Sequence, residues 1–134
     1  MKSKKSPPIS LTLEDNLKKA VTELLILHLL NTDEYYIGEL TAALKAHSKG
    51  VLKLVFPYSA IYRLQRDKYI SDTEKRIAPD GRLRQFFSIT PSGRDYYKEL
   101  LDSYHYFING INVFLDTTFD PTQLRQKASP FAEE

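Results

Sequence analysis

Apolar residues recur at helical spacing through the first third of the chain. A first helix is predicted to begin after Thr12, which suits an N-cap residue with Asp15 three positions later. From Leu24 onward, Leu27 included, this helix is apolar almost all round. That pattern predicts burial on more than one side, against its own domain and with room for contact with a second subunit. A second amphipathic helix is predicted over residues 36–48.

The third helical stretch is short and more polar. A proline at its first position, where a missing N–H costs nothing, predicts a helix over residues 57–68. Its buried side is expected to hold Ile61, Leu64 and one of two tyrosines, Tyr58 or Tyr62. The other positions then face outward.

A β-hairpin is predicted to follow this helix directly. Residues 69–77 are rich in strand-forming side chains with charges between them, and residues 82–89 supply the return strand. Ala78-Pro79-Asp80-Gly81 between them is a strong turn signal, because proline presets φ and glycine accepts a positive φ. We call this hairpin, residues 70–90, the wing.

The last periodic stretch predicts a long helix over residues 91–116, with Thr90 as its N-cap. Its apolar and aromatic side chains keep a spacing of three and four residues for about six turns. A homodimer would bury this surface if the stripe packed against the same helix of a second subunit and against the first helix. The alternative is that the stripe packs against the core of its own chain. The residues expected at the dimer interface are Leu24, Leu27, Tyr97, Leu101, Tyr104, Phe107, Ile108, Ile111 and Phe114.

These elements predict a mainly α fold with a small β-hairpin, a winged helix-turn-helix followed by a long C-terminal dimerisation helix. The expected divisions are a flexible basic arm over 1–11, a winged helix-turn-helix domain over 12–90, the dimerisation helix over 91–116 and a tail over 117–134.

Composition excludes several classes of function. The chain has no cysteine, which removes disulfides, thiolate nucleophiles and cysteine-based metal sites. No Gly-rich phosphate loop, paired-histidine spacing or nucleophile motif is present, so we expect neither an enzyme nor a bound cofactor or metal. No apolar run approaches the roughly 20 residues that span a bilayer. The expected location is cytoplasmic and nucleoid-associated, with no membrane partner.

The net charge of +2 is distributed unevenly along the chain. Residues 45–94 carry eleven Lys and Arg against four Asp and Glu, whereas the segments before and after them have balances of −1 and −4. A basic region concentrated on the third helix and the wing is the electrostatic footprint of a nucleic-acid binder. The alternative is a basic face that is merely solvated.

Side chains in this basic region suit contacts with double-stranded DNA. A helix fits the major groove, where arginine reads guanine and tyrosine or serine hydroxyls hold a base edge or phosphate. A basic hairpin tip can follow the backbone or insert arginine into the minor groove. The alternative is that the tyrosines are core residues and the arginines only solvate the helix. The candidate DNA-binding residues are Lys49, Lys53, Tyr58, Ser59, Tyr62, Arg63, Arg66, Gly81, Arg82 and Arg84.

Four motifs, in this order and spacing, resemble the PadR family of winged-helix transcriptional regulators: ELLILHLL, IGEL, PYSAIYRLQRDKYI and GRLRQFFSITPSGR. Tyr58 falls on the family's recognition-helix tyrosine, and Gly81, Arg82 and Thr90 fall on wing positions. Lys68 replaces the family's usual glycine before the wing. The resemblance implies a homodimeric repressor of a short form, with one C-terminal dimerisation helix. It also implies a dyad-symmetric operator and, in many members, release by a small-molecule effector.

The expected function is therefore a sequence-specific regulator of transcription that uses helix 57–68 in the major groove and the wing on the backbone or minor groove. Two alternatives use the same fold. One is a plasmid or phage DNA-organising protein for partition or replication control, and the other is a protein-interaction module that binds no DNA.

Overall fold

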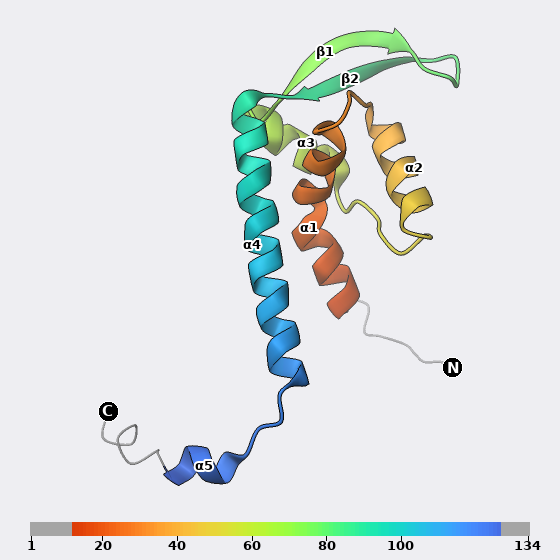
Figure 1. Ribbon diagram of the computed structural model, residues 1–134. Coiled ribbons are helices and arrows are strands. Elements are labelled where there is room, and N and C mark those ends of the chain that lie inside the picture. The colour runs from red at the N-terminus through yellow and green to blue at the C-terminus, as the bar shows by residue number, and fades with distance from the viewer. Residues whose placement is uncertain (1–11, 127–134) are drawn as a thin grey trace, which may run out of the picture. The chain divides into compact units, whose positions relative to one another are not determined.

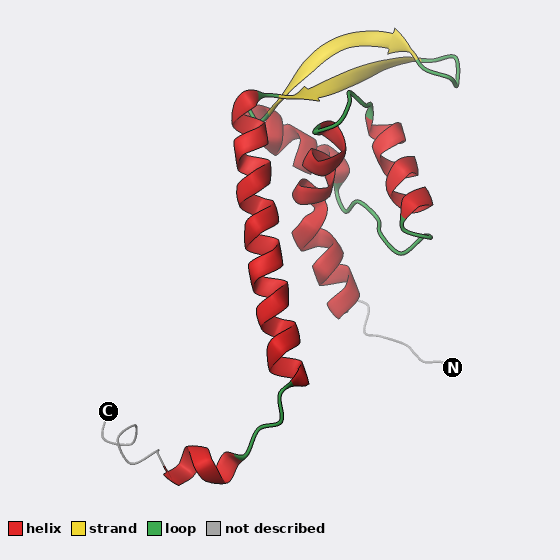
Figure 2. Ribbon diagram, in the orientation of Figure 1, coloured by secondary structure: helices red, strands yellow, loops and turns green. Residues whose placement is uncertain are grey.

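In the computed structural model, residues 12–126 are described, and the chain forms two compact units that divide between Leu101 and Asp102. The mainly α fold with a small hairpin is confirmed (Figures 1 and 2). The elements are α1 (Leu13–Leu30), α2 (Ile37–His47), α3 (Pro57–Arg66), β1 (Ile70–Ile77), β2 (Leu83–Ile89), α4 (Pro91–Asp116) and α5 (Pro121–Gln126). Within the described residues, no helix has the length and apolar character needed to cross a bilayer.

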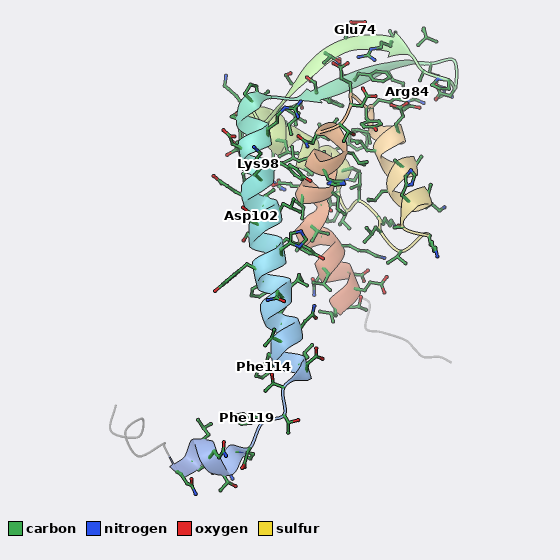
Figure 3. All side chains as sticks on the ribbon, viewed as in Figure 1. Glu74, Arg84, Lys98, Asp102, Phe114 and Phe119 are labelled. Carbon is green, nitrogen blue, oxygen red and sulfur yellow. The ribbon has the colours of Figure 1, made fainter. Side chains whose placement is uncertain are left out.

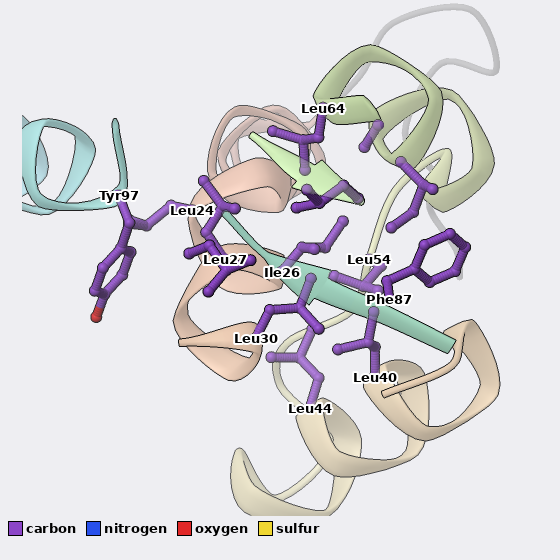
Figure 4. Close-up of a cluster of buried hydrophobic side chains, with 14 residues drawn as sticks. Leu24, Ile26, Leu27, Leu30, Leu40, Leu44, Leu54, Leu64, Phe87 and Tyr97 are labelled. Carbon is purple, nitrogen blue, oxygen red and sulfur yellow. The ribbon is translucent and has the colours of Figure 1, made fainter. Parts of the chain in front are cut away.

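The core of the first unit is built around α1. Ile26 and Leu27 are fully buried, and they meet leucines from α2 and α3 and Phe87 from β2 (Figure 4). Tyr97, near the start of α4, is also buried and its hydroxyl lies 2.6 Å from Nδ1 of His28. The first turns of α4 therefore cover a side of α1 that the other helices leave open.

This packing corrects part of the expected dimer interface. Leu24, Leu27 and Tyr97 are 9%, 0% and 7% exposed in the single chain, so they offer no surface to a second copy. The all-round apolar character of α1 reflects burial within one domain.

The wing is an antiparallel pair that runs from Ile70 opposite Ile89 to Ile77 opposite Leu83. Its register shifts by one residue between Asp72 and Lys75, so β1 carries a bulge. A further bridge, absent from the sequence-based prediction, pairs Tyr35 with Phe87 through N···O distances of 3.3 and 3.0 Å. Strand β2 is thus bonded on both sides, and the root of the wing is fixed to the segment before α2.

The junction of the wing with α4 is tightly packed. Thr90 caps α4, since its Oγ1 accepts the Gly93 N–H at 3.0 Å and donates to the Lys68 carbonyl at 2.7 Å. Gly93 is buried, and a Cβ atom there would lie 1.9 Å from the Tyr69 carbonyl oxygen. Only glycine allows this approach of α4 to the chain that enters β1.

Several element ends differ from the prediction. Helix α3 ends at Arg66 rather than at residue 68, because Lys68 adopts a left-handed conformation with φ 64°. This conformation explains why glycine is usual at that position in the resembling family. The tail expected over 117–134 contains α5, while the arm expected over 1–11 and residues 127–134 lie outside the described residues.

Candidate nucleic-acid interface

Helix α3 presents one apolar face to the core and one polar and aromatic face to solvent. Ala60, Ile61 and Leu64 fill the buried face. Tyr58 and Tyr62 are 72% and 66% exposed, so the expectation that one of them would be buried is wrong. Ala60 takes the third position of the inward face, and both tyrosines therefore lie on the other side of the helix. The candidates that lie exposed on α3 are Tyr58, Ser59, Tyr62, Arg63 and Arg66.

The connection that leads into α3 is held by a buried threonine. The Thr22 hydroxyl donates to the Lys18 carbonyl at 2.9 Å and accepts the Val55 N–H at 3.1 Å. This bond fixes the extended stretch, which carries Lys53, to α1. Lys49 and Lys53 are both exposed in the α2–α3 connection.

Arg63 is held by the protein itself. Its guanidinium forms an ion pair with Glu23 of α1, and its Nε donates to that carboxylate at 2.6 Å. The other oxygen of Glu23 accepts the Tyr96 hydroxyl of α4 at 3.3 Å, and Tyr96 stacks on Tyr69 with 4.1 Å between ring centroids. Burial raises the pKa of Tyr96, and the Glu23 carboxylate adds to the rise. Arg63 therefore links α3 to α1 and α4, a role that the sequence did not indicate.

Arg66 is more accessible than Arg63. It pairs with the adjacent Asp67 at 3.1 Å, and the hydrogen bond to that carboxylate raises the pKa of Arg66. Both side chains are about half exposed, at 56% and 46%. Exposed ion pairs of this kind contribute little to stability. Arg66 can therefore leave Asp67 and bind another anion with little loss of free energy.

The tip of the wing is organised by Asp80. One of its carboxylate oxygens accepts the backbone N–H of Arg82 at 3.0 Å, and the other accepts Nη2 of Arg84 at 2.5 Å. The bond from Arg84, with that from the Arg82 backbone, lowers the pKa of Asp80. Gly81 takes φ 83°, which completes the turn. No carboxylate within residues 12–126 pairs with the Arg82 side chain, which is exposed.

A cluster in the half of the wing nearest its turn was missed by the sequence-based prediction. Arg76 pairs with Glu34, and its guanidinium carbon lies 4.2 Å from the Phe86 ring centroid. The Phe86 ring meets Tyr36 edge-on at 5.3 Å, and Arg84 lies 5.7 Å from the Tyr36 ring. In Figure 3, Arg84 lies on the α2 side of the hairpin and Glu74 on its outer side. Arg84 thus supports the wing, while Arg82 is its outermost basic group.

The pairing of β1 with β2 carries a signal that points to this cluster. Arg76 stands directly opposite Arg84, and like charges in facing positions destabilise a sheet. Such a pair requires acidic partners outside the two strands, and Glu34 and Asp80 supply them.

The second unit carries the remaining part of the aromatic stripe. Tyr104, Phe107, Ile111 and Phe114 are 38%, 67%, 37% and 73% exposed, and Ile108 is half-buried. Leu101, the last residue of the first unit, is half-buried as well. Exposed apolar side chains on one face of a helix are typical of an interface between subunits.

Comparisons with known proteins agree on the fold. The model of the transcriptional regulator PadR-like family matches residues 26–99, which is more than half of the chain. No curated protein matches the sequence.

Solved structures of similar fold cover about three quarters of this chain. A transcriptional regulator from Clostridium thermocellum is 23% identical, with a TM-score of 0.66 over 75% of this chain and 99% of its own. A PadR-like transcriptional regulator from Bacillus cereus is 25% identical, with a TM-score of 0.65 over 77% of this chain and 99% of its own. A PadR family regulator from Eggerthella lenta is 19% identical, with a TM-score of 0.63 over 77% of this chain and 85% of its own.

Proposed function

Because the chain belongs to the transcriptional regulator PadR-like family, we propose that this DNA-binding regulator is a homodimeric repressor that reads a dyad-symmetric operator. Helix α3 enters the major groove, and the wing follows the neighbouring backbone or minor groove. The two α3 helices of a dimer then meet successive major grooves about 34 Å apart on one face of the duplex.

The observation that carries the proposal is the exposed face of α3 beside a basic hairpin tip. Tyr58, Ser59 and Tyr62 offer hydroxyl groups to base edges or phosphates, and Arg66 offers a guanidinium for guanine. At the tip, Gly81 lets the backbone come close and Arg82 supplies the charge.

The other basic candidates divide into two roles. Lys49 and Lys53 precede α3 and suit phosphate contacts. Arg63 and Arg84 are held by carboxylates of the chain, so we assign them to positioning α3 and the wing tip.

Dimerisation is proposed through the second half of α4. Tyr104, Phe107, Ile108, Ile111 and Phe114 form the interface in place of the buried residues of α1, and Leu101 lies at its edge. In this proposal the winged helix-turn-helix domain, residues 12–90, binds DNA, and the exposed part of α4 joins the protomers. A DNA target places the protein in the cytoplasm, with the nucleoid.

Replacing Arg82 with alanine tests the wing contact. Each phosphate contact adds about 0.9 to the slope of log affinity against log salt, so a dimer that loses two contacts should lose roughly 2 from its slope. Affinity should fall on all duplex sequences alike. Titrations of a random duplex across salt concentrations measure both effects.

Lys98→Ala is the matched control, because it removes one exposed positive charge from α4 and should leave the slope unchanged. An undiminished slope for Arg82→Ala contradicts a phosphate contact by the wing. Absence of any salt-sensitive binding by the wild type favours the protein-interaction module, and cooperative spreading over repeated sites favours the DNA organiser.

Replacing Glu23 with glutamine tests whether the Glu23 carboxylate keeps Arg63 from contacting DNA. Without the carboxylate, Arg63 becomes available to a phosphate, and the affinity for random duplex at low salt should rise with a slope about 0.9 steeper per protomer. As a control, Glu99→Gln makes the same change of charge at an exposed position of α4. Equal effects of the two substitutions on the salt slope would show that only net charge matters.

A further inference from the structure

Phe56, the residue immediately before α3, combines an unfavourable backbone with an exposed aromatic ring. Its φ and ψ are 51° and 56°, a left-handed conformation in which a side chain with a Cβ is strained. Its side chain is nevertheless 66% exposed. The backbone is therefore strained at this position, and burial of the ring contributes little free energy to offset that strain.

Phe56 is the N-cap residue of α3, and phenylalanine is an unusual residue at that position. Helix N-caps favour serine, threonine, aspartate and asparagine, whose side-chain oxygen accepts a free N–H of the first turn. Phenylalanine has no such atom, and no side-chain bond caps α3. Asparagine satisfies both demands, since it tolerates the left-handed region and caps well. Stability alone does not explain a phenylalanine here.

The position of Phe56 relates it to the proposed DNA-binding face. It precedes Tyr58 by two residues at the N-terminal end of α3 (Figure 1), the end at which recognition helices meet base edges. The Lys19 ammonium lies 5.8 Å from its ring centroid, and Lys53 lies three residues before it. Positive charge next to an exposed ring suits a phosphate-lined groove better than an apolar partner.

The chemistry of the ring limits what it can read. It has no hydrogen-bond donor or acceptor, and the apolar feature that base pairs present in the major groove is the C5-methyl group of thymine. We propose that Phe56 reads a thymine methyl group in each half-site and so adds an apolar contact to the polar contacts of α3. The inference rests on the proposed function and names one element of its specificity.

Thymine-to-deoxyuridine substitution tests the contact because it removes the methyl group and keeps every hydrogen-bonding atom. The probe is a duplex selected by the wild-type protein from a random library, in which each thymine is replaced singly. At one thymine per half-site, the loss of a buried methyl group should weaken wild-type binding about fourfold. Phe56→Asn should bind the thymine and deoxyuridine duplexes equally at that position.

Phe56→Asn also separates a specificity role from a structural one. Asparagine relieves the strain and caps α3, so the melting temperature should stay the same or rise while affinity for the selected duplex falls. Phe56→Leu keeps an apolar side chain and should remain sensitive to the methyl group. A lower melting temperature for Phe56→Asn would mean that the ring supports the fold, and it would overturn the inference.

Two further outcomes overturn the proposal. One is wild-type affinity that no single deoxyuridine changes, and the other is unchanged methyl discrimination by Phe56→Asn. In both, salt-sensitive binding of the duplex would persist, so the proposed DNA-binding function would stand. Failure of the wild type to bind any duplex would instead overturn the proposed function together with this inference.

Discussion

Glutamate in place of Ile111 is expected to break the proposed dimer and leave the protein monomeric. Ile111 lies within the exposed aromatic stripe of α4 between Phe107 and Phe114, and a buried carboxylate without a partner is strongly unfavourable in an interface. A monomer engages one half-site at a time, so affinity for a two-fold symmetric duplex should fall about 10²–10⁴-fold. Light scattering at micromolar concentration measures the first effect and a binding titration measures the second.

Val113→Glu is the matched control for this change. Val113 is 57% exposed on the same helix and lies roughly 200° around the helix axis from Ile111. This variant should remain a dimer and keep its affinity. A dimeric Ile111→Glu protein, or equal dissociation of both variants, would contradict an interface along the stripe.

Alanine in place of Gly93 is expected to destabilise the first unit by about 3 kcal/mol or more. The added Cβ would lie 1.9 Å from the Tyr69 carbonyl oxygen and 2.8 Å from Cγ1 of Ile89. The carbonyl cannot withdraw freely, because it accepts the Thr90 N–H at 3.0 Å. The melting temperature should fall by more than about 10 °C, as followed by circular dichroism.

Gly110→Ala provides the same substitution in the same helix with the opposite expectation. No atom lies within 4 Å of the position that its Cβ would take. Alanine in a helix interior is favoured over glycine by about 1 kcal/mol, so Gly110→Ala should be stabilising. If Gly93→Ala were as stable as the wild type, the close approach of α4 to Tyr69 would be wrong.

Much of the fold follows from local sequence patterns. The long periodicities of α1 and α4, the proline at the start of α3 and the Ala78–Gly81 turn each specify an element without help from the rest of the chain. The Tyr35–Phe87 bridge was missed because a single paired residue leaves no periodic signal. The end of α3 was misplaced because a lysine adopts the left-handed conformation that usually marks glycine.

The candidate site was less predictable because its side chains have distant partners. Helical spacing identified the outward face of α3, but Glu23 and Arg63 are 40 residues apart in the sequence and no local pattern joins them. An apolar helix face likewise does not reveal its partner. Leu27 and Tyr97 were assigned to a second copy because the sequence does not show that α4 returns to α1 within the same domain.

The bulge in β1 has a consequence for the protein at high concentration. Among the described residues, the outer edge of β1 has no strand beside it, and an unpaired edge invites edge-to-edge association into larger aggregates. Here the bulge at Thr73 and Glu74 interrupts the ladder, and four of the eight residues of the strand are charged. Both features disfavour the addition of a strand from another molecule, so the hairpin can remain exposed without becoming a site of polymerisation.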